Sequence, residues 1–163
     1  MQRIVPSLWF ADNNCEEALN YYTTVFPDSR IISINYYPDE RIDPHFAGMQ
    51  GKVLTAVFEL SGQRFIALDG GPYFRFNEAV SFTVECEDQQ EIDYYWQKLS
   101  HHPENEQCGW CKDRFGLSWQ IVPRDPEGEF MMSEAAMKAL MQMKRIDIAA
   151  LKAAAQAEKD AQG

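Results

Sequence analysis

The first half of the chain follows a pattern that begins again in the second half, and this repeat constrains the fold more than any other feature. In both halves a strand-like segment is followed by a polar residue that can cap a helix, with a glutamate three residues later, as in a capping box. The matched pairs keep an offset of 74 positions: Ser7 with Ser81, Asn14 with Asp88, Glu17 with Glu91, Ala18 with Ile92, Tyr21 with Tyr95 and Tyr22 with Trp96. A duplicated unit is the simplest interpretation.

β-Branched and aromatic runs, bounded by turn residues, predict the elements of the first half. We expect Asn14 to cap a helix and Pro27 to end it, because proline lacks the amide hydrogen that a continuing helix needs. Ser61-Gly62 predicts a tight hairpin turn. The expected elements are a strand at 4–10, a helix at 15–26, and strands at 30–37, 53–60 and 63–69.

The second half predicts a similar order with a shorter connection at 101–107. Asp88 is expected to cap its helix, and Ser133 and Asp147 can cap two further helices in an alanine-rich tail. The expected strands lie at 79–85, 109–113 and 117–122. We therefore predict an α+β fold of two tandem βαβββ modules with C-terminal helices: modules 1–72 and 78–125 within a domain at 1–130, and a tail at 131–163.

Charge and composition disfavour several partners. The net charge of −10 repels nucleic-acid phosphates and anionic membrane surfaces, so we expect neither as a partner. No segment approaches the roughly 18 apolar residues of a membrane helix, and the N-terminus lacks the pattern of a signal peptide. A cytoplasmic location is the expectation, with reduced thiols at Cys15, Cys86, Cys108 and Cys111.

Several motifs together resemble the vicinal oxygen chelate superfamily, which includes glyoxalase I, bleomycin-resistance proteins and extradiol dioxygenases. The more specific likeness is to its PhnB-like branch, many of whose members carry the name 3-demethylubiquinone 3-methyltransferase. It covers nearly the whole chain. The motifs are Leu8-Trp9-Phe10, Asn14-Cys15-Glu16-Glu17-Ala18, Tyr21-Tyr22, Phe26-Pro27, Cys108-Gly109-Trp110, the run from Asp113 to Pro123, and the run from Met141 to Asp147.

The resemblance implies a glyoxalase-like fold, in which helices cover the convex sides of two curved sheets and the concave sides enclose a pocket. It also implies a homodimer. The superfamily's enzymes hold a divalent metal at positions that correspond here to Ser7, Ser81, Gln120 and a residue near Ile66. Zinc and iron prefer imidazole, thiolate or carboxylate ligands. We therefore expect no metal at these positions and no other cofactor.

Strand alternation suggests which side chains face the pocket. Trp9 follows Ser7, Thr83 follows Ser81, and either Trp110 with Lys112 or Cys111 with Asp113 points inward; we favour the first pair. Phe58 and Glu59 face opposite ways, so at most one lines the pocket. The expected pocket residues are Ser7, Trp9, Phe58, Ser81, Thr83, Trp110, Lys112 and Gln120. Such a pocket suits a planar or partly apolar small molecule, although the three aromatic residues could equally fill the core.

No catalytic set is visible, so the catalytic residues stay unknown and enzyme activity stays open. His45, His101 and His102 fall in predicted loops, and Cys108 and Cys111 are expected to be structural thiols. Asp69 and Glu59 are the best carboxylate candidates for acid–base chemistry, but neither has an evident partner.

Three hypotheses follow from these residues. The first is a protein that binds a small molecule. The second is an enzyme, either a metal-dependent lyase or dioxygenase or the quinone methyltransferase of the family name. No glycine-rich turn of the adenosylmethionine-binding type is present to support the methyltransferase. The third is an interaction protein whose methionine-rich tail contacts a partner.

Overall fold

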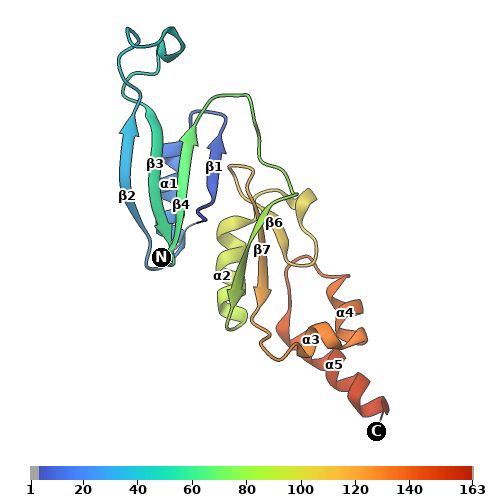
Figure 1. Cartoon of the computed structure of the whole chain (residues 1–163). Coiled ribbons are helices and arrows are strands. Elements are labelled where there is room, and N and C mark those ends of the chain that lie inside the picture. The colour runs from blue at the N-terminus through green and yellow to red at the C-terminus, as the bar shows by residue number, and fades with distance from the viewer. Residues whose placement is uncertain (1–3, 163) are drawn as a thin grey trace. The chain divides into compact units, whose positions relative to one another are not determined.

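The computed structural model describes residues 4–162, so the predicted outer bounds at residues 1 and 163 lie outside the described residues. Contacts divide the chain into two compact units, one ending at Phe76 and the other beginning at Asn77. Each unit has its own sheet and its own covering helix (Figure 1). The second unit also contains the C-terminal helices.

The described part of the first unit, residues 4–76, contains four strands, one α-helix and a short 3₁₀ helix. The strand order is β1-β4-β3-β2, with β1 parallel to β4 and the other pairs antiparallel. The elements are β1 Ser7–Phe10, α1 Cys15–Val25, β2 Arg30–Tyr36, η1 Pro44–Phe46, β3 Val53–Leu60 and β4 Gln63–Asp69. The predicted βαβββ order is confirmed for this half, and the turn at Ser61-Gly62 joins β3 and β4 as expected.

The core of the first unit lies between α1 and one face of its sheet. α1 has an apolar stripe at helical spacing, and its buried residues are Cys15, Ala18, Leu19, Tyr22 and Val25. The sheet supplies alternate residues, since successive strand residues point to opposite faces. These are Leu8, Phe10, Ala56, Phe58, Phe65 and Ala67, each no more than 6% exposed. The other face of this sheet is not covered by α1.

The cap of α1 differs from the prediction. Asn14 occupies the N-cap position, but its side chain makes no capping hydrogen bond. The backbone N–H of Cys15 instead donates to Oδ2 of Asp69 at 3.2 Å. Asp69 ends β4, beside the start of the helix. Its carboxylate, from a strand far along the sequence, therefore caps α1 in place of the expected Asn14 side chain. The helix ends at Val25, ahead of Pro27 as predicted.

The second unit repeats three of the four strands. Its elements are β5 Ser81–Cys86, α2 Gln89–Leu99, η2 Pro103–Asn105, β6 Trp110–Lys112 and β7 Ser118–Pro123. The order β5-β7-β6 matches β1-β4-β3, with β5 parallel to β7. Among the described residues no strand takes the place of β2. The short connection after α2 forms η2 instead, and His101 N–H donates to the carbonyl of Lys112 beside β6.

The predicted cap of α2 is confirmed. Oδ1 of Asp88 accepts from the N–H of Glu91 at 2.9 Å, and the Glu91 side chain accepts from the N–H of Glu87. One face of the sheet packs against α2 through Cys86, Cys111, Trp119 and Ile121, each no more than 3% exposed. The opposite face is free of this helix.

The C-terminal helices form the last part of the second unit. They are α3 Glu129–Met132, α4 Glu134–Leu140 and α5 Ile148–Gln162. Gly109 adopts φ +85° and lies so close to Ile146 and to the carbonyl of Ile121 that a Cβ would approach both within 3 Å, which explains a glycine there. The side chain of Gln89 bonds to the backbone of Ile146 and Ile148. No helix within residues 4–162 combines the length and apolar character that a membrane crossing requires.

Candidate functional site

The face of the second sheet opposite α2 brings together five of the predicted site residues. Strand register pairs Thr83 with Gln120, Trp110 with Gln120, and Lys112 with Ser118. Paired residues and their alternate neighbours share a face. We call this surface the open face of the second sheet, and its members are Ser81, Thr83, Trp110, Lys112, Ser118 and Gln120. The preferred alternative for β6, with Trp110 and Lys112 on the face of Gln120, agrees with this register.

An amide and a hydroxyl are already joined on the open face. Nε2 of Gln120 donates to Oγ of Ser81 at 2.8 Å, which fixes the orientation of the amide. This bond uses one donor of Gln120 and leaves its carbonyl oxygen as an acceptor. The hydroxyl hydrogen of Ser81 also stays available as a donor. The pair can therefore offer one acceptor and one donor to a bound molecule.

The tryptophan of the open face offers a flat apolar surface. Trp110 is half-buried, and its backbone exchanges hydrogen bonds with Gln107 in the connection ahead of β6. An indole ring held on a strand gives a large contact area at low cost in conformational entropy. Stacking on this ring therefore suits a planar ligand.

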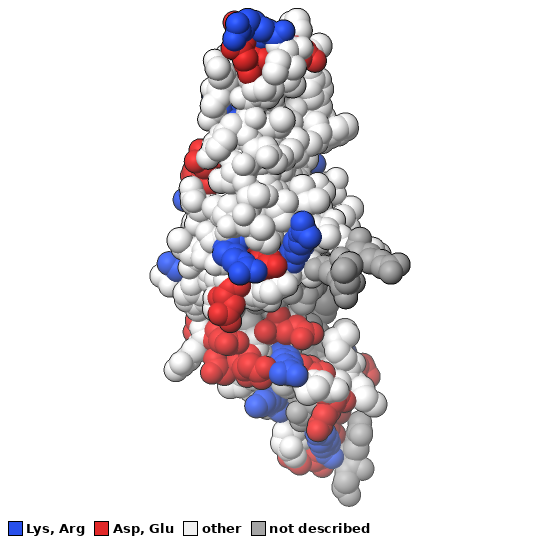
Figure 2. Space-filling model, turned by 60° about the vertical axis from the view of Figure 1, so that its left-hand side comes forward, with Lys and Arg blue, Asp and Glu red and all other residues white. Residues whose placement is uncertain are grey.

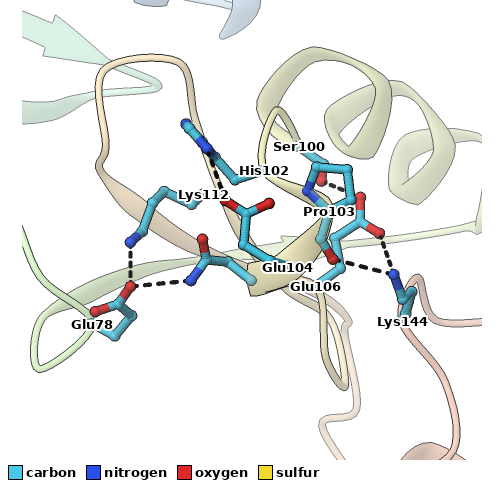
Figure 3. A network of polar contacts seen from close by, with 9 residues as sticks. Glu78, Ser100, His102, Pro103, Glu104, Glu106, Lys112 and Lys144 are labelled. Atoms are coloured by element: carbon cyan, nitrogen blue, oxygen red, sulfur yellow. Dashed lines mark hydrogen bonds and ion pairs between the residues drawn. The ribbon is translucent and has the colours of Figure 1, made fainter.

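The lysine of the open face is held in an ion pair that the sequence did not suggest. Nζ of Lys112 donates to Oε1 of Glu78, and the same oxygen accepts from Nδ2 of Asn105 at 3.2 Å (Figure 3). The hydrogen bond from Lys112 holds the pKa of Glu78 below its usual value. The Lys112 side chain is only 19% exposed.

The contacts around this pair fix the connection that replaces the missing strand. Oε1 of Glu106 accepts from Ser100 at 2.7 Å, and its other oxygen accepts from Lys144 at 3.3 Å (Figure 3). Lys144 also donates to the carbonyl of Pro103. His102, expected to be a solvated loop residue, pairs with Glu104 at 3.3 Å. These bonds hold residues 100–107 beside β6 and so support the edge of the site.

Ser118 shares the open face but is covered. Ser118 is 1% exposed, and its hydroxyl has no hydrogen-bond partner in the described structure. A buried hydroxyl without a partner costs free energy. We expect Ser118→Ala to raise the free energy of unfolding by about 1 kcal/mol, measured by urea denaturation. A destabilised variant would show that the hydroxyl has a partner in solution.

The first unit presents an open face of its own. Register places Ser7 beside Ile66 and Trp9 beside Leu68, with Thr55 opposite Leu68 on the next strand. Trp9 is fixed in place: Nε1 donates to the carbonyl of Gly71 at 2.8 Å, and the ring meets Phe74 edge-on at 4.9 Å. A Cβ at Gly70 would overlap this indole, so only glycine fits there. This face carries apolar residues at Trp9, Val57, Ile66 and Leu68 and polar ones that include Thr55, Glu59 and Arg64.

Phe58 was predicted to line the pocket, and the structure places it elsewhere. It is fully buried and stacks on Phe65 at 5.3 Å, within the core beneath α1. The reason is strand alternation, which puts Phe58 opposite to Val57 and Glu59. Glu59 takes the open side and pairs with Arg30 at 2.9 Å. Of the two carboxylates considered for acid–base chemistry, one is thus in an ion pair and Asp69 caps a helix.

The donors at the superfamily's metal positions do not fit a divalent metal. Ser7 pairs with Ile66 and Ser81 with Ser118, so the counterpart of Gln120 in the first unit is Leu68, which lies two residues from Ile66. Two hydroxyls, one amide and an aliphatic side chain lack the imidazole, thiolate or carboxylate that zinc and iron prefer. Among the side chains that the structure describes, no three of His, Cys, Asp or Glu gather as a metal site.

The cysteines are free thiols. Burial raises the pKa of Cys15, Cys86 and Cys111 to about 12, so these three are protonated near neutral pH. Cys111 faces the α2 side of the sheet, whereas Cys108 is partly exposed at a positive φ of 51°. A thiol of such high pKa is a poor nucleophile, which agrees with the structural role expected for Cys111.

A hollow of about 660 Å³ lies among the C-terminal helices. Its lining is Glu127, Met132, Ser133, Glu134, Ala155, Glu158 and Lys159. Ser133 is already engaged, since it donates to Glu158 and caps α4. Figure 2 shows acidic side chains gathered over the part of the surface toward these helices. This hollow is open and acidic, and its chemistry differs from that of the aromatic open face.

Comparison with known proteins gives one family and several structures. The family model described as 3-demethylubiquinone-9 3-methyltransferase matches residues 2–122 and ends before α3. A Bacillus cereus PhnB protein, described as a candidate for the same methyltransferase, is 35% identical; the match covers 76% of this chain and 100% of that one, with a TM-score of 0.61. A Pseudomonas aeruginosa protein is 21% identical, with coverages of 77% and 100% and a TM-score of 0.58.

A more distant structure is FosX from Listeria monocytogenes, a fosfomycin resistance protein. It is 15% identical, with coverages of 81% and 99% and a TM-score of 0.48. Among curated proteins, none matches the chain significantly. The family match spans both sheets, while the tail motif at 141–147 lies outside it.

Proposed function

The chain belongs to the PhnB-like family described as 3-demethylubiquinone-9 3-methyltransferase, and from this membership and the open face we propose that it binds a small planar molecule without a metal ion. The observation that supports the proposal most directly is the grouping on one sheet face of a half-buried indole with hydroxyl, amide and ammonium groups. Ligand sites combine a mainly apolar surface with a few placed polar groups.

Each part of the face has a role in the proposed binding. Trp110 stacks on the ring system of the ligand. Lys112 and Ser81 donate hydrogen bonds to ligand oxygens, and the carbonyl of Gln120 accepts one. These groups come from β5, β6 and β7, so their spacing is set by the strand ladder and not by a mobile loop.

Quinone methylation, the activity in the family description, is the alternative. The open face could hold a quinone, but a methyl transfer also needs a methyl donor. Among the described strands, the pairs β2–β3, β3–β4 and β6–β7 are antiparallel, and the pairs β1–β4 and β5–β7 are parallel. A doubly wound parallel sheet with a glycine-rich turn, the usual adenosylmethionine platform, is thus not what these units form. Calorimetry with adenosylmethionine tests the alternative, and binding would favour it.

Native mass spectrometry of freshly purified protein tests three parts of the proposal together. We expect a homodimer, no stoichiometric metal, and a co-purified small molecule or an empty protein that takes one up. A bound zinc, iron or manganese ion lost on chelation, together with loss of ligand binding, would contradict a metal-free site.

Replacing Trp110 should weaken ligand binding. We expect Trp110→Ala to raise the Kd for the neutral bicyclic ketone 1-tetralone by about tenfold, because stacking on an aromatic ring contributes on the order of 1 kcal/mol. Ligand-observed NMR titration measures the Kd. Trp110→Phe, which keeps a ring, should restore most of the affinity.

A second tryptophan provides the matched control for this experiment. Trp96 is also half-buried, but it lies on α2, on the other side of the sheet. Trp96→Ala should leave the Kd for 1-tetralone within twofold of the parent protein. Equal Kd values for Trp110→Ala and the parent protein would place the ligand away from the open face.

A further inference from the structure

We infer that the open face of the second sheet selects uncharged, oxygen-bearing ligands over anionic ones, because Glu78 neutralises Lys112. This inference rests on the proposed function and names the class of ligand that the site takes. Lys112 is the one cation among the strand residues of this face, which are all described. Its pairing with Glu78 therefore decides whether an anion finds an opposite charge there.

Glu78 is held in position by two donors. Its Oε1 accepts from Lys112 and from Nδ2 of Asn105, and Asn105 belongs to the connection that the Glu106 contacts hold beside β6. An anionic ligand that approached Lys112 would have to displace a carboxylate fixed in this way. Glu78 thus competes with anions for the ammonium, while the remaining two N–H groups of Lys112 can donate to an uncharged oxygen.

The charges around the face act in the same direction. Glu85 continues the face beyond Thr83, opposite Val122, and the whole chain carries a net charge of −10. With Lys112 paired, an anion meets no uncompensated positive charge on these strands and a negative field beyond them. A neutral carbonyl or hydroxyl carries no net charge for that field to repel and still gains hydrogen bonds. The face therefore distinguishes ligands by charge as well as by shape.

Two bicyclic probes of similar size test the inference by NMR titration: 1-tetralone, which is neutral, and 1-naphthoate, which is anionic. The parent protein should bind 1-tetralone more tightly. Glu78→Gln frees the ammonium and should tighten 1-naphthoate by about tenfold, since hydrogen bonds to a charged group are roughly twice as strong as neutral ones. The Kd for 1-tetralone should change less than twofold. Adding Lys112→Met should remove the gain.

Glu87 offers a matched control. It is also an exposed glutamate in an ion pair, with Arg124 at 2.6 Å, and Glu87→Gln changes the net charge by the same amount. This variant should leave both Kd values unchanged. If Glu87→Gln tightened 1-naphthoate as much as Glu78→Gln, the effect would come from overall charge and the inference would be wrong.

Different results would overturn the proposed function and the charge selectivity inferred for the open face. Binding of neither probe to the parent protein, or binding that Trp110→Ala leaves unchanged, would overturn the proposed function. Binding that depends on Trp110 but favours 1-naphthoate in the parent protein, or that Glu78→Gln does not shift, would overturn the inference and leave the proposed function standing.

Discussion

Replacing Asp113 with alanine is expected to lower the free energy of unfolding of the second unit by about 3–5 kcal/mol. Asp113 is fully buried, and its carboxylate accepts hydrogen bonds with both of its oxygens. Oδ1 accepts from the backbone N–H of Phe115 at 2.8 Å and of Leu117 at 3.0 Å, and Oδ2 accepts from Nε1 of Trp119 at 2.8 Å. Alanine would leave these donors without their acceptor in a place that water does not reach. Urea denaturation measures the loss.

Two variants show whether the hydrogen bonds are the cause. Asp113→Asn keeps one carbonyl oxygen, so it should lose less stability than Asp113→Ala but more than a surface change. Asp160→Ala removes an exposed aspartate on α5 and should stay within about 0.5 kcal/mol of the parent protein. A loss below 1 kcal/mol for Asp113→Ala would mean that the turn satisfies its donors in another way.

Sequence patterns predicted the hairpin and the helix cap well because both depend on interactions between residues close together in the chain. The hairpin of β3 and β4 was predicted at its observed bounds, since alternating residues flank a two-residue turn with Gly62 at φ +80°. Asp88 was predicted as a cap because its partner, Glu91, stands three residues away. The α+β class and the relation of the two halves followed from such signals and are confirmed.

The errors occurred where distant residues decide the structure. Asn14 has the sequence context of a cap, yet Asp69 supplies it from β4, and nothing near either residue in the sequence indicates this pairing. The βαβββ description was also applied to the second module, although only three strands were assigned in it, at 79–85, 109–113 and 117–122, and three are observed there. Its connection contains Pro103, which has no N–H to donate to a ladder, and it forms a 3₁₀ helix.

In the candidate site, too, features set by nearby residues were predicted and features set by distant residues were missed. Alternation could place Trp110 and Lys112 on the face of Gln120, because the strand period is two. It could not choose between Phe58 and Glu59, since only packing against α1 decides which of them is buried. Glu78 was missed entirely: it precedes β5, in a segment without periodic pattern, and its partner Lys112 lies 34 positions away. Charge pairs of this separation leave no local signal.

Asp69 should make the stability of the first unit fall as pH rises above the ordinary pKa of aspartate. The residue is 2% exposed and its Oδ1 has no hydrogen-bond partner in the described structure; burial raises the pKa of its carboxyl above the usual value. Between the ordinary and the raised pKa, the folded protein holds a proton that the unfolded chain has released. Unfolding then releases a proton, so the free energy of unfolding decreases with pH across this window and stays lower above it.

Asparagine and alanine at position 69 separate this charge effect from the cap. Asp69→Asn keeps an acceptor for the Cys15 N–H and carries no charge, so its stability relative to the parent protein should rise from pH 3.5 to pH 7, as measured by urea denaturation. Asp69→Ala loses the acceptor as well and should be about 1–2 kcal/mol less stable than Asp69→Asn at every pH.

Asp39 is the contrasting control, since the hydrogen bond from Arg41 lowers the pKa of its exposed carboxyl. Asp39→Asn should therefore show a small trend of opposite sign, because the ion pair stabilises the folded state only once the carboxyl is ionised. A pH-independent difference for Asp69→Asn would mean that Asp69 titrates alike in the folded and unfolded chain.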